Sequence, residues 1–249
     1  MSEKIFVAGA AGAIGSALVP LLVDAGYAVY GSTRRAERVQ ALEACGAVPV
    51  VVDVFDAPAL RAALMPIAPA IVIHQLTDLP RDLDPKRMAD AAHRNARVRT
   101  EGTRNLVAAA VAAGTRRLVA QSIAWLYAPG ATPHAEEDPL DLAAEGTRGI
   151  SVDGVAALER SVLGMAGLTG TVLRYGQFYG PGTSTAAPRG ACPVHVEAAA
   201  WAAVLALRHA QGGVFNIAED NPEVSSEKAR RELGWQASLR LRQRQGVAS

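Results

Sequence analysis

Three glycines at a fixed spacing are the first residues in this chain that could do chemistry. Gly9, Gly12 and Gly15 stand between a short apolar run and a longer helical pattern. In a strand, turn and helix unit, the first glycine permits a tight turn, the second lets the backbone approach a pyrophosphate, and the third lets the helix pack on the strand. Helix N-terminal N–H groups, beside Ala13 and Ile14, would face that anion. The spacing predicts a dinucleotide site, whereas an ordinary tight turn would need only one or two glycines.

The end of the next apolar run indicates which dinucleotide would bind. An acidic residue there would bond the adenosine ribose of NAD and repel a 2′-phosphate. This chain has Thr33 at that place, followed by Arg34 and Arg35. Each charge-assisted bond from an arginine to a phosphate contributes about 1.5 to 3 kcal/mol, which would favour NADP by tenfold or more. We therefore expect NADP, with NAD possible; the alternative is that both arginines are solvated residues at a helix start.

The elements that must position these residues alternate between short apolar runs and helical patterns. Apolar runs without alternation are typical of parallel strands that helices cover on both faces. The expected strands lie at 5–7, 28–30, 48–52, 70–73, 117–121, 171–174 and 214–218, and the expected helices at 14–25, 36–45, 57–64, 87–113 and from 149 to 162. The order predicts an α/β fold with a doubly wound parallel (Rossmann-type) sheet. We expect a dinucleotide-binding domain over 1–175 and a reduced C-terminal substrate region, 176–249, folded onto the same core.

Composition excludes several other classes of protein. The chain has 249 residues, a formal net charge of +1 and 50% hydrophobic residues, so it has no basic field to hold nucleic acid. Cys45 and Cys192 are too few for a disulfide framework and lack zinc-site spacing, which favours a cytoplasmic protein without a metal. The apolar run 5–23 could be mistaken for a membrane span, but its glycine spacing favours a strand, turn and buried helix.

Several motifs in order resemble the short-chain dehydrogenase/reductase superfamily, in its extended and atypical branch of NAD-dependent epimerase/dehydratase-like proteins. Besides the glycine turn, "IVIHQLT", "EGTRNLVAAA" and "RYGQFYGPGT" look like family segments. The resemblance implies that an acidic residue after the third strand lies near the adenine and that residues after the fourth strand line the cofactor. The further cofactor-site residues that it implies are Asp53, Val54, Gln75, Leu76, Thr77 and Tyr175, the last of them in a segment that also packs.

The chain departs from the family at the residues that carry proton chemistry. Family members use a Ser or Thr after the fifth strand and a Tyr-x-x-x-Lys pair, in which Tyr passes the proton and Lys lowers its pKa and holds the nicotinamide ribose. Ser122 matches the first of these, but alignment places Ser151 and Val155 at the Tyr and Lys positions. We expect Ser122 and Tyr127 as catalytic candidates, Tyr127 being the best replacement proton donor. The alternatives are a hydroxyl that bonds backbone and an aromatic ring that packs.

The resemblance implies an oxidoreductase that acts on a small carbonyl or hydroxyl compound, and the two arginines after the second strand make it NADP-preferring. Few residues separate the last family segments, so the substrate lid looks shortened. Two alternatives stay open: a non-catalytic module that senses NADP(H), and a nucleotide-sugar epimerase or dehydratase. The second is disfavoured because those reactions use the missing base. We expect no nucleic acid or membrane partner. The resemblance favours a homodimer, because in the family the equivalent helices often pair between subunits.

Overall fold

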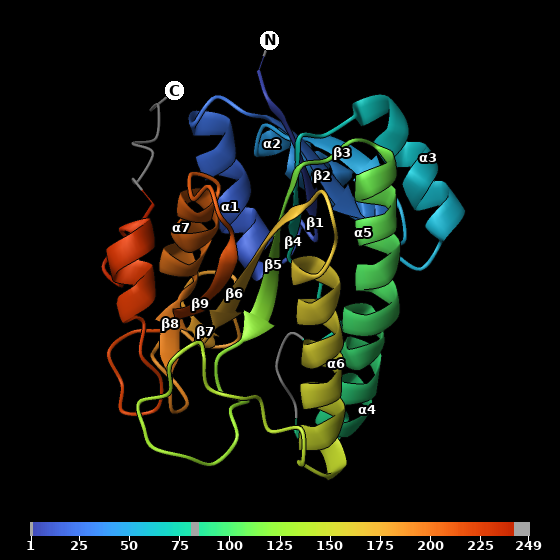
Figure 1. Ribbon diagram of the computed structural model, residues 1–249. Coiled ribbons are helices and arrows are strands. Elements are labelled where there is room, and N and C mark those ends of the chain that lie inside the picture. The colour runs from blue at the N-terminus through green and yellow to red at the C-terminus, as the bar shows by residue number, and fades with distance from the viewer. Residues whose placement is uncertain (1, 81–84, 242–249) are drawn as a thin grey trace.

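Seven parallel strands form the central sheet of the protein (Figure 1), in a computed structural model that describes residues 2–80 and 85–241. The strands are β1 (Lys4–Ala8), β2 (Ala28–Thr33), β3 (Val48–Val51), β4 (Ile71–His74), β5 (Arg117–Ile123), β6 (Thr169–Tyr175) and β9 (Gly213–Ile217). Their order is β3-β2-β1-β4-β5-β6-β9, and all neighbours pair in parallel. The strand order reverses direction between β1 and β4, the point at which open α/β sheets bind ligands. The expected doubly wound parallel sheet is confirmed.

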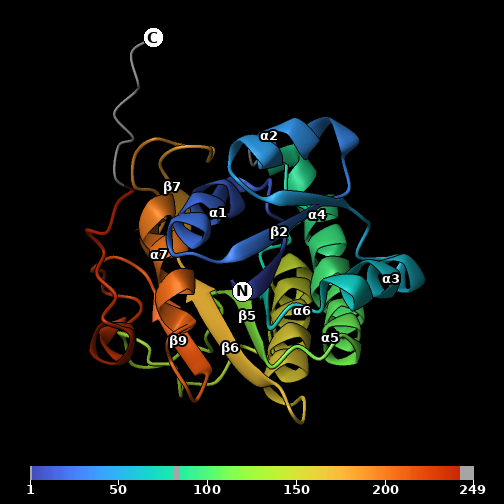
Figure 2. The ribbon, with the colours of Figure 1, turned by 90° about the horizontal axis from the view of Figure 1, so that it is seen from above.

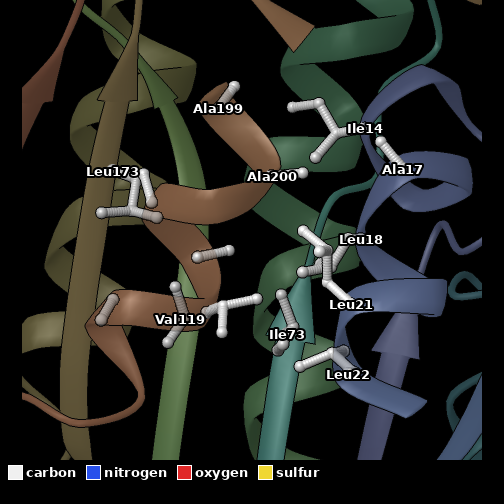
Figure 3. Close-up of a cluster of buried hydrophobic side chains, with 14 of the residues drawn as sticks. Ile14, Ala17, Leu18, Leu21, Leu22, Ile73, Val119, Leu173, Ala199 and Ala200 are labelled. Atoms are coloured by element: carbon white, nitrogen blue, oxygen red, sulfur yellow. The ribbon is translucent and has the colours of Figure 1, made fainter. Parts of the chain in front are cut away.

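Helices cover both faces of the sheet (Figure 2). They are α1 (Ala13–Asp24), α2 (Val39–Ala44), α3 (Ala57–Ile67), α4 (Pro85–Arg97), α5 (Thr103–Ala112), α6 (Gly146–Leu163) and α7 (Val196–Ala206). Helices α1, α2 and α7 pack on one face, and α3, α5 and α6 pack on the other. Figure 3 shows the first core, where Leu18 and Leu22 of α1 approach Ile73 of β4 and Val119 of β5. Strands buried on both sides explain why the apolar runs do not alternate.

The C-terminal part of the chain adds to this sheet. It supplies β9 and α7, and a separate two-stranded sheet pairs β7 (Gln177–Tyr179) with β8 (Pro193–His195). Trp235 is fully buried, and its indole N–H donates to the Ala198 carbonyl at 2.8 Å. This part therefore packs on α7 and extends the central sheet by one strand.

The long helix expected at 87–113 is interrupted. Helix α4 passes at Arg97 into a π-helical turn, Val98–Gly102, and α5 then continues to Ala112. A π-turn inside an α-helix displaces the side chains on its surface and is frequent at functional sites. Across the described ranges, no helix combines the length and apolarity that a membrane crossing requires.

Candidate active site

The glycine turn forms a backbone cradle at the carboxyl end of β1. Gly9 has φ of +87°, and a Cβ added there would lie 2.7 Å from the Gln75 carbonyl oxygen. A Cβ on Gly15 would lie 2.4 Å from the Gly9 carbonyl oxygen. Gly12 is the N-cap of α1 and has no side chain to accept a capping hydrogen bond. The first N–H of the helix to donate to a helical carbonyl is that of Ser16, which donates to Gly12. The N–H groups of the first helical turn, including those of Ala13 and Ile14, therefore lie where they could bind an anion.

Arg34, after β2, lies near a further basic side chain, Arg94, that the sequence did not indicate. Thr33 Oγ1 accepts the Arg35 N–H at 3.1 Å, which holds the turn. Arg34 Nη2 lies 3.5 Å from Asp78 Oδ1, and Arg94 Nε of α4 lies 3.8 Å from the same oxygen. Both guanidinium groups are about half exposed, so they could contact a ligand. Arg94 was hidden because its helix has a mixed charge pattern that is typical of a solvated face.

Asp53 and Val54 form the turn that follows β3. The Asp53 carboxylate accepts the Phe55 N–H at 2.9 Å. The Val54 carbonyl accepts a 3.0 Å hydrogen bond from the Asn105 side-chain amide of α5. This turn is thus anchored to the helix layer at the same sheet edge as the glycine turn.

The segment after β4 contains a buried amide without a partner. Gln75 is 5% exposed, and neither its side-chain nitrogen nor its oxygen meets hydrogen-bond geometry with any residue within 2–80 or 85–241, although the amide lies close enough to the Tyr175 hydroxyl to oppose the rise in its pKa. Unpaired buried polar groups are rare because each costs free energy, so this amide is a candidate for contact with a ligand. Leu76 is half-buried and Thr77 is exposed. The Leu76 N–H donates to His74 Nδ1 at 3.2 Å, so the proton of this imidazole lies on Nε2 and faces Thr103 Oγ1 at 2.9 Å.

A buried polar network brings Ser122 and Tyr127 together. Ser122 Oγ donates to Glu159 of α6 at 2.7 Å, and the same carboxylate accepts two bonds from Arg174, at 2.9 and 2.7 Å. Arg174 also donates to the Tyr127 hydroxyl at 2.9 Å, and that hydroxyl donates to Asn216 Oδ1 at 2.7 Å. Burial raises the pKa of Tyr127, although Arg174 opposes the shift. Both candidate hydroxyls are therefore engaged with protein acceptors.

Sequence reasoning missed the charged centre of this network. Glu159 and Arg174 form an ion pair whose side chains are 8% and 6% exposed. The available signal was positional, because Glu159 lies at helical spacing from Val155 and Val162, and Arg174 interrupts an apolar strand. A charged residue at a core position is rarely buried unless it is paired.

Tyr175 and the two α6 positions complete the site residues. Tyr175 is 1% exposed, and its hydroxyl donates to the Ala199 carbonyl at 3.1 Å; burial raises its pKa. Ser151 Oγ bonds to the Thr147 carbonyl of its own helix, and Val155 packs in a small apolar cluster. Helix α6 contains neither tyrosine nor lysine.

Comparison with known proteins identifies close matches. Residues 5–193 match the NAD dependent epimerase/dehydratase family. The chain is similar to a 3-diazoavenalumate denitrifying reductase from a Streptomyces species, with 39% identity over 247 residues that cover 90% of this chain and 78% of that protein.

Solved structures show the same fold. A UDP-glucose 4-epimerase from Brucella ovis in complex with NAD has a TM-score of 0.76 at 19% identity, over 95% of this chain and 94% of that one. A short-chain dehydrogenase/reductase superfamily protein from Agrobacterium tumefaciens with bound NAD has a TM-score of 0.73 at 21% identity, over 95% and 93%. At these identities the likeness extends to the fold alone.

Proposed function

The chain belongs to the NAD-dependent epimerase/dehydratase family, in the extended branch of the short-chain dehydrogenase/reductase superfamily, and on that premise we propose that it is a nicotinamide-dependent reductase that needs no acid on α6. When bound, the dinucleotide would supply a hydride. The cradle at Gly9, Gly12 and Gly15 fits such a ligand because it lets a pyrophosphate approach the backbone. The Gln75 amide fits it because its hydrogen-bonding atoms have no partner among the described residues.

The absence of tyrosine and lysine from α6 is the observation that carries the choice of reaction. Reduction of a carbonyl by hydride produces an alkoxide, which needs a proton, and a positioned acid typically contributes about 10² to 10⁴ in rate. A hydride acceptor that loses a neutral leaving group needs no proton. The diazo group in the name of the Streptomyces relative is of this kind.

We therefore propose that the substrate is a diazo compound that reacts as an arenediazonium ion. In that reaction a hydride would form a C–H bond at the ring carbon while the C–N bond breaks, and the electron pair of that bond would leave with dinitrogen. The carbon is reduced, the reduced coenzyme is oxidised, and no proton is taken up or released. Leu79 and Trp125, apolar side chains that are more than a third exposed in the loops after β4 and β5, would suit an aromatic ring.

The test is coenzyme oxidation with two substrate panels, one of arenediazonium salts and one of aldehydes and ketones. We expect oxidation with the diazonium panel, release of dinitrogen, and transfer of deuterium from C4-deuterated coenzyme to the product carbon. Arenediazonium ions also react with reduced nicotinamides in solution, so a Gly15→Val variant serves as the background control. Coenzyme binding without oxidation by either panel would favour the non-catalytic sensor, and oxidation with carbonyl compounds alone would refute the diazo assignment.

We propose NADP as the preferred coenzyme, held at its 2′-phosphate by Arg34 and Arg35. Arg94 supports this assignment because its guanidinium and that of Arg34 both lie beside the Asp78 carboxylate, so two cations are close to the proposed phosphate position. Arg34→Ala should weaken NADPH binding by about tenfold or more and leave NADH binding within about twofold, measured by fluorescence titration. Equal losses for the two coenzymes would mean that Arg34 does not contact the extra phosphate.

Three further expectations from the sequence stay predictions. These are the cytoplasmic location, the homodimer through the long helices, and the division into a dinucleotide domain and a reduced substrate region. Sedimentation of the purified chain would test the second.

A further inference from the structure

Arg99 is a buried arginine without a partner. It is 7% exposed, and it makes no hydrogen bond or ion pair with any residue in the ranges that the structure describes. Arg174 is buried to a similar extent, but its guanidinium is neutralised by Glu159. Burial alone lowers the pKa of Arg99 to about 10, so the side chain is still charged at neutral pH. A buried charge normally requires a counter-ion, and within residues 2–80 and 85–241 no carboxylate pairs with Arg99.

The side chain lies between α4 and α6. Arg99 belongs to the π-helical turn Val98–Gly102, and a Cβ added to Gly154 of α6 would lie 3.5 Å from Arg99 Cδ and 3.1 Å from Ala96 Cα. Because Gly154 has no side chain, α6 can approach α4 closely while the aliphatic part of the Arg99 side chain still fits between the helices. Gly154 immediately precedes Val155, the position at which the resemblance places the family lysine.

The charge of Arg99 acts at the carboxyl ends of the strands. Long helical side chains lie over the turn N-terminal to their own Cα. In Figure 1, α4 and α6 run side by side, and their N-terminal halves extend beyond the arrowhead of β5, at the carboxyl ends of the strands. The Arg99 charge also contributes, after burial, to the low pKa of His74, which immediately precedes Gln75. Arg99, which has no counter-ion among the described residues, therefore acts on the same end of β4 that Gln75 follows.

We propose that Arg99 binds an anionic oxygen of the ligand that occupies this crevice. It would supply from the π-helical turn after α4 the cation that the family lysine supplies from α6. The guanidinium can donate two parallel N–H groups to a carboxylate or other oxyanion, and the low local dielectric strengthens that pair. The oxygen belongs either to a carboxylate or phenolate of the substrate or to the coenzyme. This inference rests on the proposed function, because it assumes that a dinucleotide occupies the crevice.

The experiment compares the wild-type chain with Arg99→Met, Arg99→Lys and a control, Arg116→Met. Arg116 is exposed just before β5, at the amino ends of the strands. Arg116→Met therefore removes one positive charge, as Arg99→Met does, but at the other end of the sheet from the glycine turn. NADPH is titrated by fluorescence, and benzoate, cinnamate and 4-nitrophenolate are then titrated with saturating NADP⁺. We expect Arg99→Met to weaken one of the two titrations by about tenfold or more, Arg99→Lys to restore part of the loss, and Arg116→Met to match the wild type.

The melting temperature of the ligand-free chain separates ligand binding from a structural role. Arg99→Met removes an uncompensated buried charge, so the free variant should melt at least about 2 °C higher. A loss confined to the NADPH titration assigns the oxygen to the coenzyme, and a loss confined to the oxyanion probes assigns it to the substrate. Unchanged affinities in both titrations would overturn the proposal, as would weaker binding accompanied by a lower melting temperature in both Arg99 variants. A wild type that binds neither NADPH nor NADH would refute the proposed function itself.

Discussion

Replacing Glu159 by glutamine should strongly destabilise the protein. The carboxylate accepts hydrogen bonds from Ser122 Oγ at 2.7 Å and from Arg174 at 2.9 and 2.7 Å, and neither member of the ion pair is more than 8% exposed. Glutamine has almost the same shape but no charge, and its amide N–H groups would face the guanidinium. Breaking a buried pair in this way costs about 3–5 kcal/mol because one charge is left uncompensated. For a chain of this size that corresponds to a melting temperature about 6–20 °C lower.

Urea denaturation of three variants would measure this cost. Glu159→Gln should show the loss given above. Glu101→Gln is the matched control because Glu101 pairs with Arg97 on the surface at 2.7 Å, with side chains 33% and 59% exposed, and should cost less than about 1 kcal/mol. The double variant Glu159→Leu/Arg174→Met removes both charges and should recover much of the loss. If Glu159→Gln unfolds within about 1 kcal/mol of the wild type, the argument that this pair neutralises a buried cation is wrong.

Three further predictions concern the edge of the sheet. Gly15→Val should abolish NADPH binding in a fluorescence titration, because even a Cβ there lies 2.4 Å from the Gly9 carbonyl oxygen; binding within threefold of wild type would contradict the cradle. Gln75→Leu should raise the free energy of unfolding without ligand by about 1–3 kcal/mol, since it removes an unpaired buried amide, and should weaken coenzyme binding. Burial, and secondarily Arg99, lower the pKa of His74 from 6.5 to about 4. As the pH falls, His74 is therefore protonated in the unfolded chain at a higher pH than in the folded chain. Stability should therefore fall by up to about 3 kcal/mol as the pH drops from about 6.5 to about 4, and His74→Asn should show less of this fall in pH-dependent urea denaturation.

The sheet could be predicted from the sequence because its signals are local. Runs such as Ile71–His74, apolar on both faces, are typical of covered parallel strands, and Gly26 and Gly46 mark helix ends with φ of +88° and +86°. The glycine turn was equally readable, since each of its glycines answers a steric demand of its own neighbours. The expected strands all exist, with boundaries displaced by three residues or fewer.

The polar contacts could not be predicted because they depend on tertiary approach. Ser122 and Glu159 lie 37 residues apart in sequence, and their hydrogen bond exists only because α6 packs against β5. Arg94 and Arg99 lie in one helical pattern of mixed charge, yet one is half exposed and the other is buried. The π-helical turn after Arg97 changes which side chains face inward, and no pattern in the sequence predicted this turn.

The buried network also bears on which reaction the site can support. Ser122 and Tyr127, the two hydroxyls expected to carry catalysis, each donate to a protein acceptor, Glu159 and Asn216. Either would have to break that bond before it could protonate a substrate, and burial makes Tyr127 a weaker acid than usual by raising its pKa. A site that retains the backbone cradle for a hydride donor but holds its hydroxyl protons within the protein is better suited to an acceptor that needs no proton. Activity on diazonium compounds that persists in Tyr127→Phe would agree with this reasoning, whereas a loss of turnover with stability unchanged would assign the proton to Tyr127.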